Sequence, residues 1–311
     1  MGVSCRRHVM AYVVGLLVTL GFASASSAQV DTASIVGTVN DPSGAAVPGA
    51  IVTVTNVATN EVQTITAGDG GDYVFPYLRV GEYTVSVEAK GFKKSVRVGI
   101  ILSVQDRKRV DVAMELGTTS EEVKVTVTDV VLDTQSADVG HVVDAQQVSD
   151  LPLNGRRYDQ LSLLAAGVNQ ASPSFQQRAE GVFSVNGNSS TQNNFVLDGA
   201  DNNSFTTNLQ DQSAQGVQPA VDSLAEFKLQ TRDYNVEYGR SAGGVINASI
   251  KSGTNSFHGN LYEFLRNDKL DANDFFLNKG DVSKPTFQQN QYGFTFGGPI
   301  RKDKTFFFLN W

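Results

Sequence analysis

The sequence predicts a mainly β protein that is exported from the cytoplasm. Three observations support this prediction: an apolar stretch at the start, short alternating apolar and polar segments over residues 33–116, and aromatic-rich alternating segments after residue 255. The expected order is a signal peptide, a seven-stranded β-sandwich, an α+β domain and the first strands of a truncated transmembrane β-barrel.

The first 28 residues have the pattern of a secretory signal peptide. Arg6 and Arg7 precede an apolar run over residues 9–22, and small residues follow at 26–28. The run has about 14 residues, whereas a spanning helix needs about 20. A cleaved signal is therefore favoured over a membrane helix. Cleavage also removes Cys5, the single cysteine, so neither a disulfide framework nor thiol chemistry is expected.

The charge of the chain argues against a nucleic-acid partner. The formal net charge is −7, and loss of Arg6 and Arg7 with the signal makes it −9. An acidic chain without basic runs lacks the electrostatic footprint of a nucleic-acid-binding protein.

Residues 33–116 alternate apolar and polar positions in seven short segments with Gly, Pro and Asp turns between them. Closely spaced strands of this kind predict a β-sandwich. Its expected core consists of Ile35, Val39, Ile51, Val54, Phe75, Leu78, Tyr83, Val85, Val87 and Val112.

Residues 117–129 form a polar linker that ends in an extended stretch. Val123, Val125 and Val127 would share one face of a strand, a pattern that suits capture by a partner through strand addition. The same stretch fits a final sandwich strand or the first strand of the next domain, and the residues alone leave these alternatives open.

Residues 130–255 mix helical and strand patterns, which predicts an α+β domain. The expected helices and strands are residues 145–150, 158–164, 183–186, 194–199 and 245–250.

Helix and turn signals stand before the last of these strands. Asp222 is placed to cap a helix over residues 223–227, with Glu226 in its first turn. Tyr238 with Gly239, and Gly243 with Gly244, predict sharp turns at positive φ, which glycine adopts without strain.

Residues 256–311 predict membrane-type strands. Residues 260–266, 291–297 and 304–311 alternate, and Tyr292, Phe294 and Phe296 share one face. Aromatic, alternating segments of about ten residues are typical of transmembrane barrels. The 56 residues after Asn255 suffice for about three such strands, whereas plugged transporters have about 22, so the chain is expected to be an N-terminal fragment.

Several motifs follow one another in a defined order near the end of the chain. They are the stretch 225–230, the Tyr238–Gly239 pair, the run GGVIN at 243–247, and the continuation EFLRNDKLDANDFF at 263–276. This order resembles the plug of a TonB-dependent outer-membrane receptor, and the continuation resembles the Oar-like group. The resemblance implies that residues 225–230 form a helix.

Residues 70–92 carry a second resemblance. An aromatic strand with Tyr73 and Phe75 is followed by Leu78, Gly81 and Tyr83, and the stretch ends in a Gly-Phe pair at 91–92. This pattern is similar to the carboxypeptidase-regulatory-like domain, the non-catalytic accessory domain of those enzymes.

The resemblances imply a division of the chain and a set of site residues. The division is a signal peptide (1–28), a carboxypeptidase-regulatory-like sandwich (33–116), a linker with a Ton box (117–129), a plug (130–255) and the start of an outer-membrane barrel (256–311). The implied Ton box, captured by a TonB-type inner-membrane energy-transducing protein, is Glu121, Glu122, Val123, Lys124, Val125, Thr126, Val127 and Thr128. The implied plug hallmarks are Asp198, Gly199, Tyr238, Gly239, Gly243, Gly244 and Asn247.

These expectations favour a transporter over an enzyme. His141 and His258, the histidines outside the signal, lie far apart, and no hydrolase or zinc motif appears. No catalytic residue, metal or cofactor is therefore expected. The implied function is active uptake of a large substrate (a peptide, protein or glycan) across the outer membrane, with the front domain in the periplasm and lipid around the barrel. The alternative is a surface adhesion or carbohydrate-binding protein that does not transport.

Overall fold

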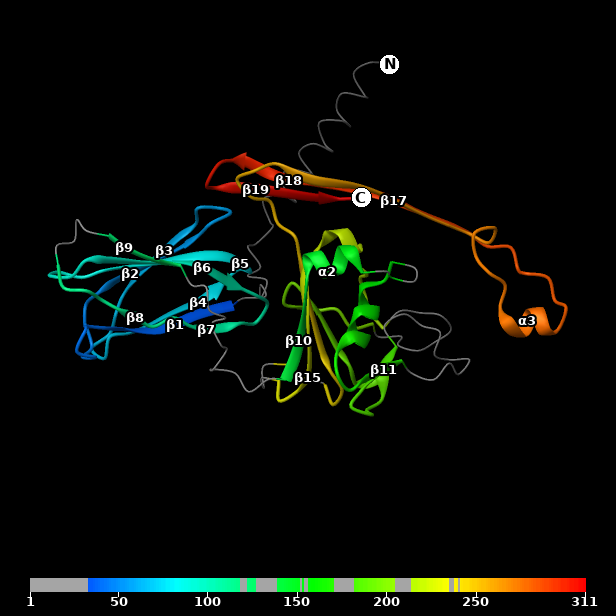
Figure 1. Cartoon of the computed structure of the whole chain (residues 1–311), viewed down its shortest axis with the longest axis horizontal. Coiled ribbons are helices and arrows are strands. Elements are labelled where there is room, and N and C mark those ends of the chain that lie inside the picture. The colour runs from blue at the N-terminus through cyan, green and yellow to red at the C-terminus, as the bar shows by residue number, and fades with distance from the viewer. Residues whose placement is uncertain are drawn as a thin grey trace, which may run out of the picture.

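The computed structural model describes residues 33–117, 122–126, 139–151, 153, 156–170, 182–204, 214–234, 238–239 and 241–311. The predicted signal peptide, with Cys5, lies outside the described residues. The described chain forms three parts (Figure 1): a front sandwich (β1–β9), a middle domain (β10–β16) and a C-terminal sheet (β17–β19).

The front sandwich packs two sheets against each other. In one, β1 (Ala33–Asn40) lies between β4 (Asp72–Leu78) and β7 (Arg107–Arg109), and β8 (Val112–Ala113) also pairs with β1. The other sheet runs in the order β3 (Val62–Thr66), β2 (Ile51–Asn56), β5 (Gly81–Glu88), β6 (Lys94–Leu102) and β9 (Glu122–Thr126). The last expected segment of the sandwich is thus divided into β7 and β8, which both run parallel to β1.

The core of the sandwich follows the alternation of its strands. All but one of the predicted core residues are buried between the sheets. The prediction for Ile51 is wrong, because its side chain is 48% exposed while Val52 and Val54 point inward. Successive side chains of a strand face opposite sides, so Ile51 cannot share a face with Val54.

The middle domain is built on a mixed sheet. Its strand order is β10 (Val139–Asp144), β15 (Leu224–Arg232), β16 (Val245–Ile250), β13 (Asn194–Leu197) and β14 (Ala200–Asp201). A separate pair joins β11 (Val168–Gln170) to β12 (Phe183–Val185). The helical segments are α2 (Ala145–Asp150) and the 3-10 turns η1 (Tyr158–Leu164), η2 (Ser190–Gln192) and η3 (Val221–Ser223).

The predictions of a helix over residues 223–227 and over residues 225–230 are both wrong. Asp222 lies inside the short turn η3, makes no side-chain cap, and is followed by the strand β15. From Ala225 to Gln230 apolar and polar residues alternate, and β15 is hydrogen-bonded between β10 and β16. Period-two alternation with neighbours on both sides stabilises a strand, and it outweighs the helix-start signal at Asp222.

The C-terminal sheet is an antiparallel meander of β17 (His258–Asn267), β18 (Gln288–Arg301) and β19 (Thr305–Asn310). A long connection between β17 and β18 contains α3 (Phe275–Lys279), whereas residues 302–304 alone join β18 to β19. On β18, Tyr292, Phe294 and Phe296 are exposed on one face, as predicted, and Gly293 and Thr295 are buried on the other.

Candidate functional site

Asp198 and Gly199 form the tight turn between β13 and β14. Both residues have positive φ, 48° and 78°, which the favoured two-residue hairpin turns require. The Asp198 carboxylate accepts a hydrogen bond from the Ile250 N–H at 2.9 Å, and so ties the turn to the end of β16. Burial raises the pKa of the Asp198 carboxyl, and the hydrogen bond from Ile250 opposes that rise.

Gly243 and Gly244 are required for close packing and not for a positive φ. Neither is among the glycines with positive φ, so the predicted backbone conformation is wrong. A Cβ on Gly243 would lie 2.4 Å from Asn193 Oδ1, and one on Gly244 would lie 2.9 Å from Val185 Cγ2. The Gly244 N–H donates to that same Asn193 oxygen at 3.0 Å. Asn193, which the sequence did not single out, is therefore the partner that explains the glycine pair.

Gly243→Ala is expected to destabilise the middle domain, because the new methyl group collides with a buried amide. Overpacking of this kind costs about 1–3 kcal/mol. Gly239→Ala is the matched control, since a Cβ at Gly239 meets nothing within 4 Å. Thermal unfolding of both variants measures the difference, and equal midpoints would contradict the packing argument.

The other implied plug residues lie near the same sheet. Gly239 accepts a hydrogen bond from the Asn194 side chain at 3.1 Å, and Tyr238 precedes it in a bend. Asn247 is fully buried at the centre of β16, opposite Val196 on β13 and Lys228 on β15. The structure therefore gathers the implied hallmarks along β13 and β16.

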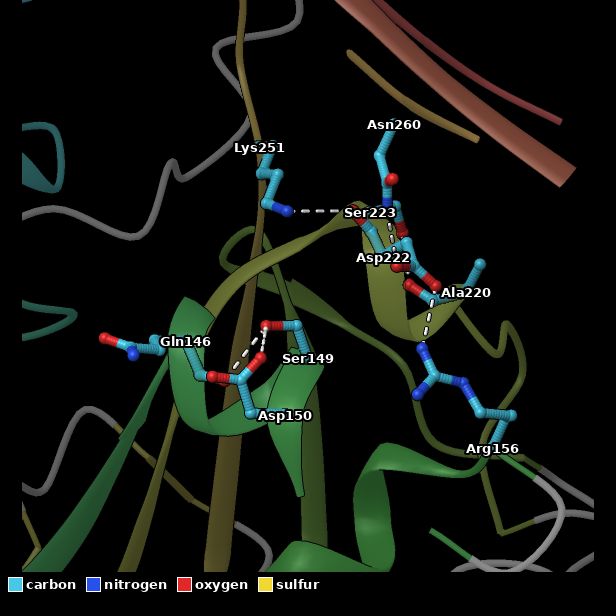
Figure 2. Close-up of polar contacts among 9 residues, drawn as sticks. All are labelled: Gln146, Ser149, Asp150, Arg156, Ala220, Asp222, Ser223, Lys251 and Asn260. Atoms are coloured by element: carbon cyan, nitrogen blue, oxygen red, sulfur yellow. Dashed lines mark hydrogen bonds and ion pairs between the residues drawn. The ribbon is translucent and has the colours of Figure 1, made fainter. Parts of the chain in front are cut away.

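A polar cluster around Asp222 joins the middle domain to the C-terminal sheet (Figure 2). The Arg156 guanidinium lies 2.9 Å from the Asp222 carboxylate, and the two side chains are only 12% and 7% exposed. Asn260, on β17, donates from Nδ2 to the other carboxylate oxygen at 3.1 Å. Lys251, in the connection to β17, donates to the Asp222 carbonyl at 3.0 Å.

The same arginine also contacts an aromatic ring of β17. The Arg156 guanidinium carbon stands 3.9 Å from the centre of the Phe264 ring, a cation–π contact. Asn260 and Phe264 are four residues apart on β17, so their side chains lie on the same face of the strand. Because both contact the middle domain, this face points toward it. We name these residues the Asp222 cluster: Arg156, Asp222, Lys251, Asn260 and Phe264. Sequence reasoning missed it as a site because its members lie far apart in the chain.

The predicted Ton box is found in part at a sheet edge. Residues 122–126 form β9, which runs parallel to β6 and stands last in its sheet. The structure thus shows the alternative of a final sandwich strand. Val123 and Val125 are half-buried and Lys124 is exposed, as alternation requires. Glu121, Val127 and Thr128 lie outside the described residues.

Comparison with known proteins identifies both ends of the described chain. The carboxypeptidase regulatory-like domain family matches residues 34–115, and the outer membrane beta barrel domain family matches residues 249–311. The TonB-dependent transporter Oar of Myxococcus xanthus is 32% identical over 94% of this chain, and the chain spans 28% of that transporter.

Solved structures give weaker likenesses. The siderophore receptor PirA of Acinetobacter baumannii is 22% identical, with a TM-score of 0.39 over 53% of this chain and 22% of the receptor. The outer-membrane transporter YddB of Escherichia coli is also 22% identical, with a TM-score of 0.40 over 52% of this chain and 24% of the transporter. Within the described residues, no helix has the length and apolarity to span a membrane.

The chain therefore is an outer-membrane protein with a carboxypeptidase regulatory-like domain in front of membrane-type strands. Over 94% of its residues the chain is a homologue of the TonB-dependent transporter Oar.

Proposed function

We propose that the chain acts in a TonB-dependent transporter that takes up a large substrate (a peptide, a protein or a glycan) across the outer membrane. In this proposal the C-terminal sheet is the start of the pore wall in lipid, and the middle domain is the plug that gates the pore. The proposed divisions are residues 33–116, 117–129, 130–255 and 256–311. The transport activity of the Oar homologue supports the proposal.

One observation carries the assignment of wall and plug: the C-terminal sheet has two unlike faces. Leu261, Phe294 and Trp311 are exposed and apolar on one face. On the other face Asn260 binds the middle domain through the Asp222 cluster. An apolar outer face and a polar inner face are what a membrane-spanning strand needs when it encloses a plug.

Uptake by intact cells tests the proposal. Fluorescently labelled pools of peptides and of oligosaccharides are offered to cells with and without the TonB-type energising complex. Accumulation of either pool only in energised cells is expected. Accumulation that is equal in both strains would contradict active transport, and binding without accumulation would favour the adhesion protein.

The edge strand β9 supports the proposed Ton box. Among the residues that the structure describes, β9 stands at the end of its sheet and pairs only with β6, so the other side of its backbone is available to a strand of an energy-transducing partner. Deleting residues 121–128 is expected to abolish energised uptake and to leave binding at the cell surface intact.

A substitution pair separates this role from general damage to the sandwich. Lys124→Pro and Thr64→Pro each place proline at an exposed position of an edge strand, on β9 and β3 respectively. Proline removes one backbone donor at either place. Only Lys124→Pro is expected to reduce uptake. Equal losses in the two variants would remove the Ton box from β9.

A further inference from the structure

Within the described residues, hydrogen bonds and an ion pair join the front sandwich to the other two parts at two places. The first contact is the turn of residues 103–106, which lies between β6 and β7 and touches β15 of the middle domain. The second is the turn between β2 and β3, which touches the turn between β18 and β19. The two contacts come from different loops of the sandwich, so together they fix its orientation.

The first contact buries Val104 against the middle domain. Val104 is 0% exposed, yet it belongs to neither of the two hydrophobic cores. Its N–H donates a hydrogen bond to the Glu226 carboxylate. Next to it, Lys228 Nζ lies 3.9 Å from Asp106 Oδ1, and both Glu226 and Lys228 are buried. Val104 therefore lies buried at the contact between the sandwich and the middle domain.

The second contact is centred on Asp303, in the short turn of the C-terminal sheet. Its carboxylate accepts hydrogen bonds from Asn60 of the sandwich at 2.9 Å and from Asn255 at 2.8 Å. The Asn255 side chain in turn accepts from the Asp303 N–H at 2.9 Å, and the Asn255 N–H donates to the Ala58 carbonyl at 3.0 Å. Three parts of the molecule thus meet at one carboxylate.

The position of Asp303 tells which side of the membrane the sandwich faces. The connection from β17 to β18 is long and contains α3, whereas the connection from β18 to β19 is a three-residue turn. Outer-membrane barrels place short turns in the periplasm and long loops outside. The sandwich lies beside the short turn, at the opposite end from α3 (Figure 1), and so stands at the periplasmic end of the middle domain.

The composition of these two contacts allows the sandwich to separate from the other two parts. A cavity of about 690 Å³ lies where the three parts meet, and Arg79, Glu226, Lys251 and Lys304 are among its lining residues. The charged groups of this lining can be hydrated when the parts separate, and apolar residues such as Ile101 and Phe306 line the cavity beside them. Polar contacts of this kind between domains allow relative motion.

We propose that the front sandwich is a second gate at the periplasmic mouth of the pore, held shut by the Val104–Glu226 and Asn60–Asp303–Asn255 contacts, and that it swings away when the middle domain moves. This inference rests on the proposed transport function. A partner that pulls on residues 121–128 would pull on the sandwich itself, because β9 is one of its strands.

Thiol labelling of Val104→Cys in intact cells tests the gate. Cys5 is the single cysteine of the 311 residues, so the label reports Val104→Cys within them, and the parent protein without the substitution gives the background. With a protonophore present, the thiol is expected to be protected from N-ethylmaleimide. In energised cells offered the labelled peptide and oligosaccharide pools, labelling is expected to be at least tenfold faster. Val39→Cys, which lies in the sandwich core at 0% exposure, is the matched control and should stay protected in both states.

A variant that weakens the second contact provides a separate test of the gate. Asp303→Ala removes the central acceptor of the second contact and should raise labelling of Val104→Cys in de-energised cells, with no effect on Val39→Cys. If uptake is energised while Val104→Cys stays equally protected in both states, the gate is refuted and transport stands. If uptake does not depend on energy, transport itself fails. Labelling of both cysteines would mean that the sandwich unfolds, and would also overturn the gate.

Discussion

Asp222→Ala is expected to loosen the middle domain from the C-terminal sheet and to lower its stability by about 3–5 kcal/mol, the usual cost of breaking a buried ion pair by removing one partner. The substitution leaves the Arg156 guanidinium, 12% exposed, without its carboxylate. It also removes the acceptor of the Asn260 side chain on β17. The loss should appear as a lower unfolding midpoint and as faster hydrogen exchange in η3 and β17.

An exposed ion pair at the end of β17 provides the control. Arg266 and Asp271 are joined at 3.4 Å, with side chains that are 47% and 44% exposed. Asp271→Asn should therefore cost no more than about 1 kcal/mol, because solvent screens exposed pairs. An effect of Asp222→Ala as small as that of Asp271→Asn would show that the Asp222 cluster does not hold the two parts together.

The strands with one apolar face and one polar face were predictable from the sequence. In the sandwich and in β18, alternation alone sorts inward from outward residues, and the structure follows it at Val54, Phe75 and Phe294. A period of two is a local property, so no knowledge of distant neighbours is needed. Ile51 shows the limit, because its strand is apolar at adjacent positions and only the packing shows which of them faces inward.

The middle domain was harder because long-range contacts decide its local structure. Asp222 has the local signature of a helix start, yet residues after it join a sheet between β10, about 80 positions earlier, and β16. Gly243 and Gly244 look like turn residues, but the reason for them is Asn193, about 50 positions away. Spacing along the chain contains no information about such partners, and the Asp222 cluster and the docking contact escaped sequence reasoning for the same reason.

Docking of the front sandwich is expected to weaken as the pH rises from about 5 to about 8. Burial is the main cause that raises the pKa of Glu226 from 4.5 to about 7, and the nearby Asp106 adds to it. The hydrogen bond from Val104 and the Lys228 ammonium oppose the rise, and Asp144 is the residue opposite Glu226 on β10. Once the sandwich leaves, the carboxyl is in water and its pKa returns toward its ordinary value.

The direction of the effect follows from proton binding. The docked state holds a proton on Glu226 between pH 4.5 and about 7, where the undocked state has lost it, so the contribution to docking is complete below pH 4.5 and is lost as the pH rises through about 7. At about 1.4 kcal/mol per pH unit, the change is on the order of 3 kcal/mol. Because the thiolate is the reactive form of cysteine, the labelling rate of Val104→Cys in the purified full-length protein is divided by that of a free cysteine peptide at the same pH. This ratio should be higher at pH 8 than at pH 5.

Glu226→Gln isolates the titrating group from the rest of the interface. The amide keeps an oxygen that accepts from the Val104 N–H and has the shape of the protonated acid, but it cannot ionise. The variant should stay protected at both pH values. Its labelling rate at pH 8, relative to the free cysteine peptide at that pH, should be close to the relative rate of the parent at pH 5. Val39→Cys, in the core of the sandwich, separates docking from unfolding over the same range. If Glu226→Gln keeps the pH dependence of the parent, the titrating group is elsewhere and Glu226 is only a structural acceptor.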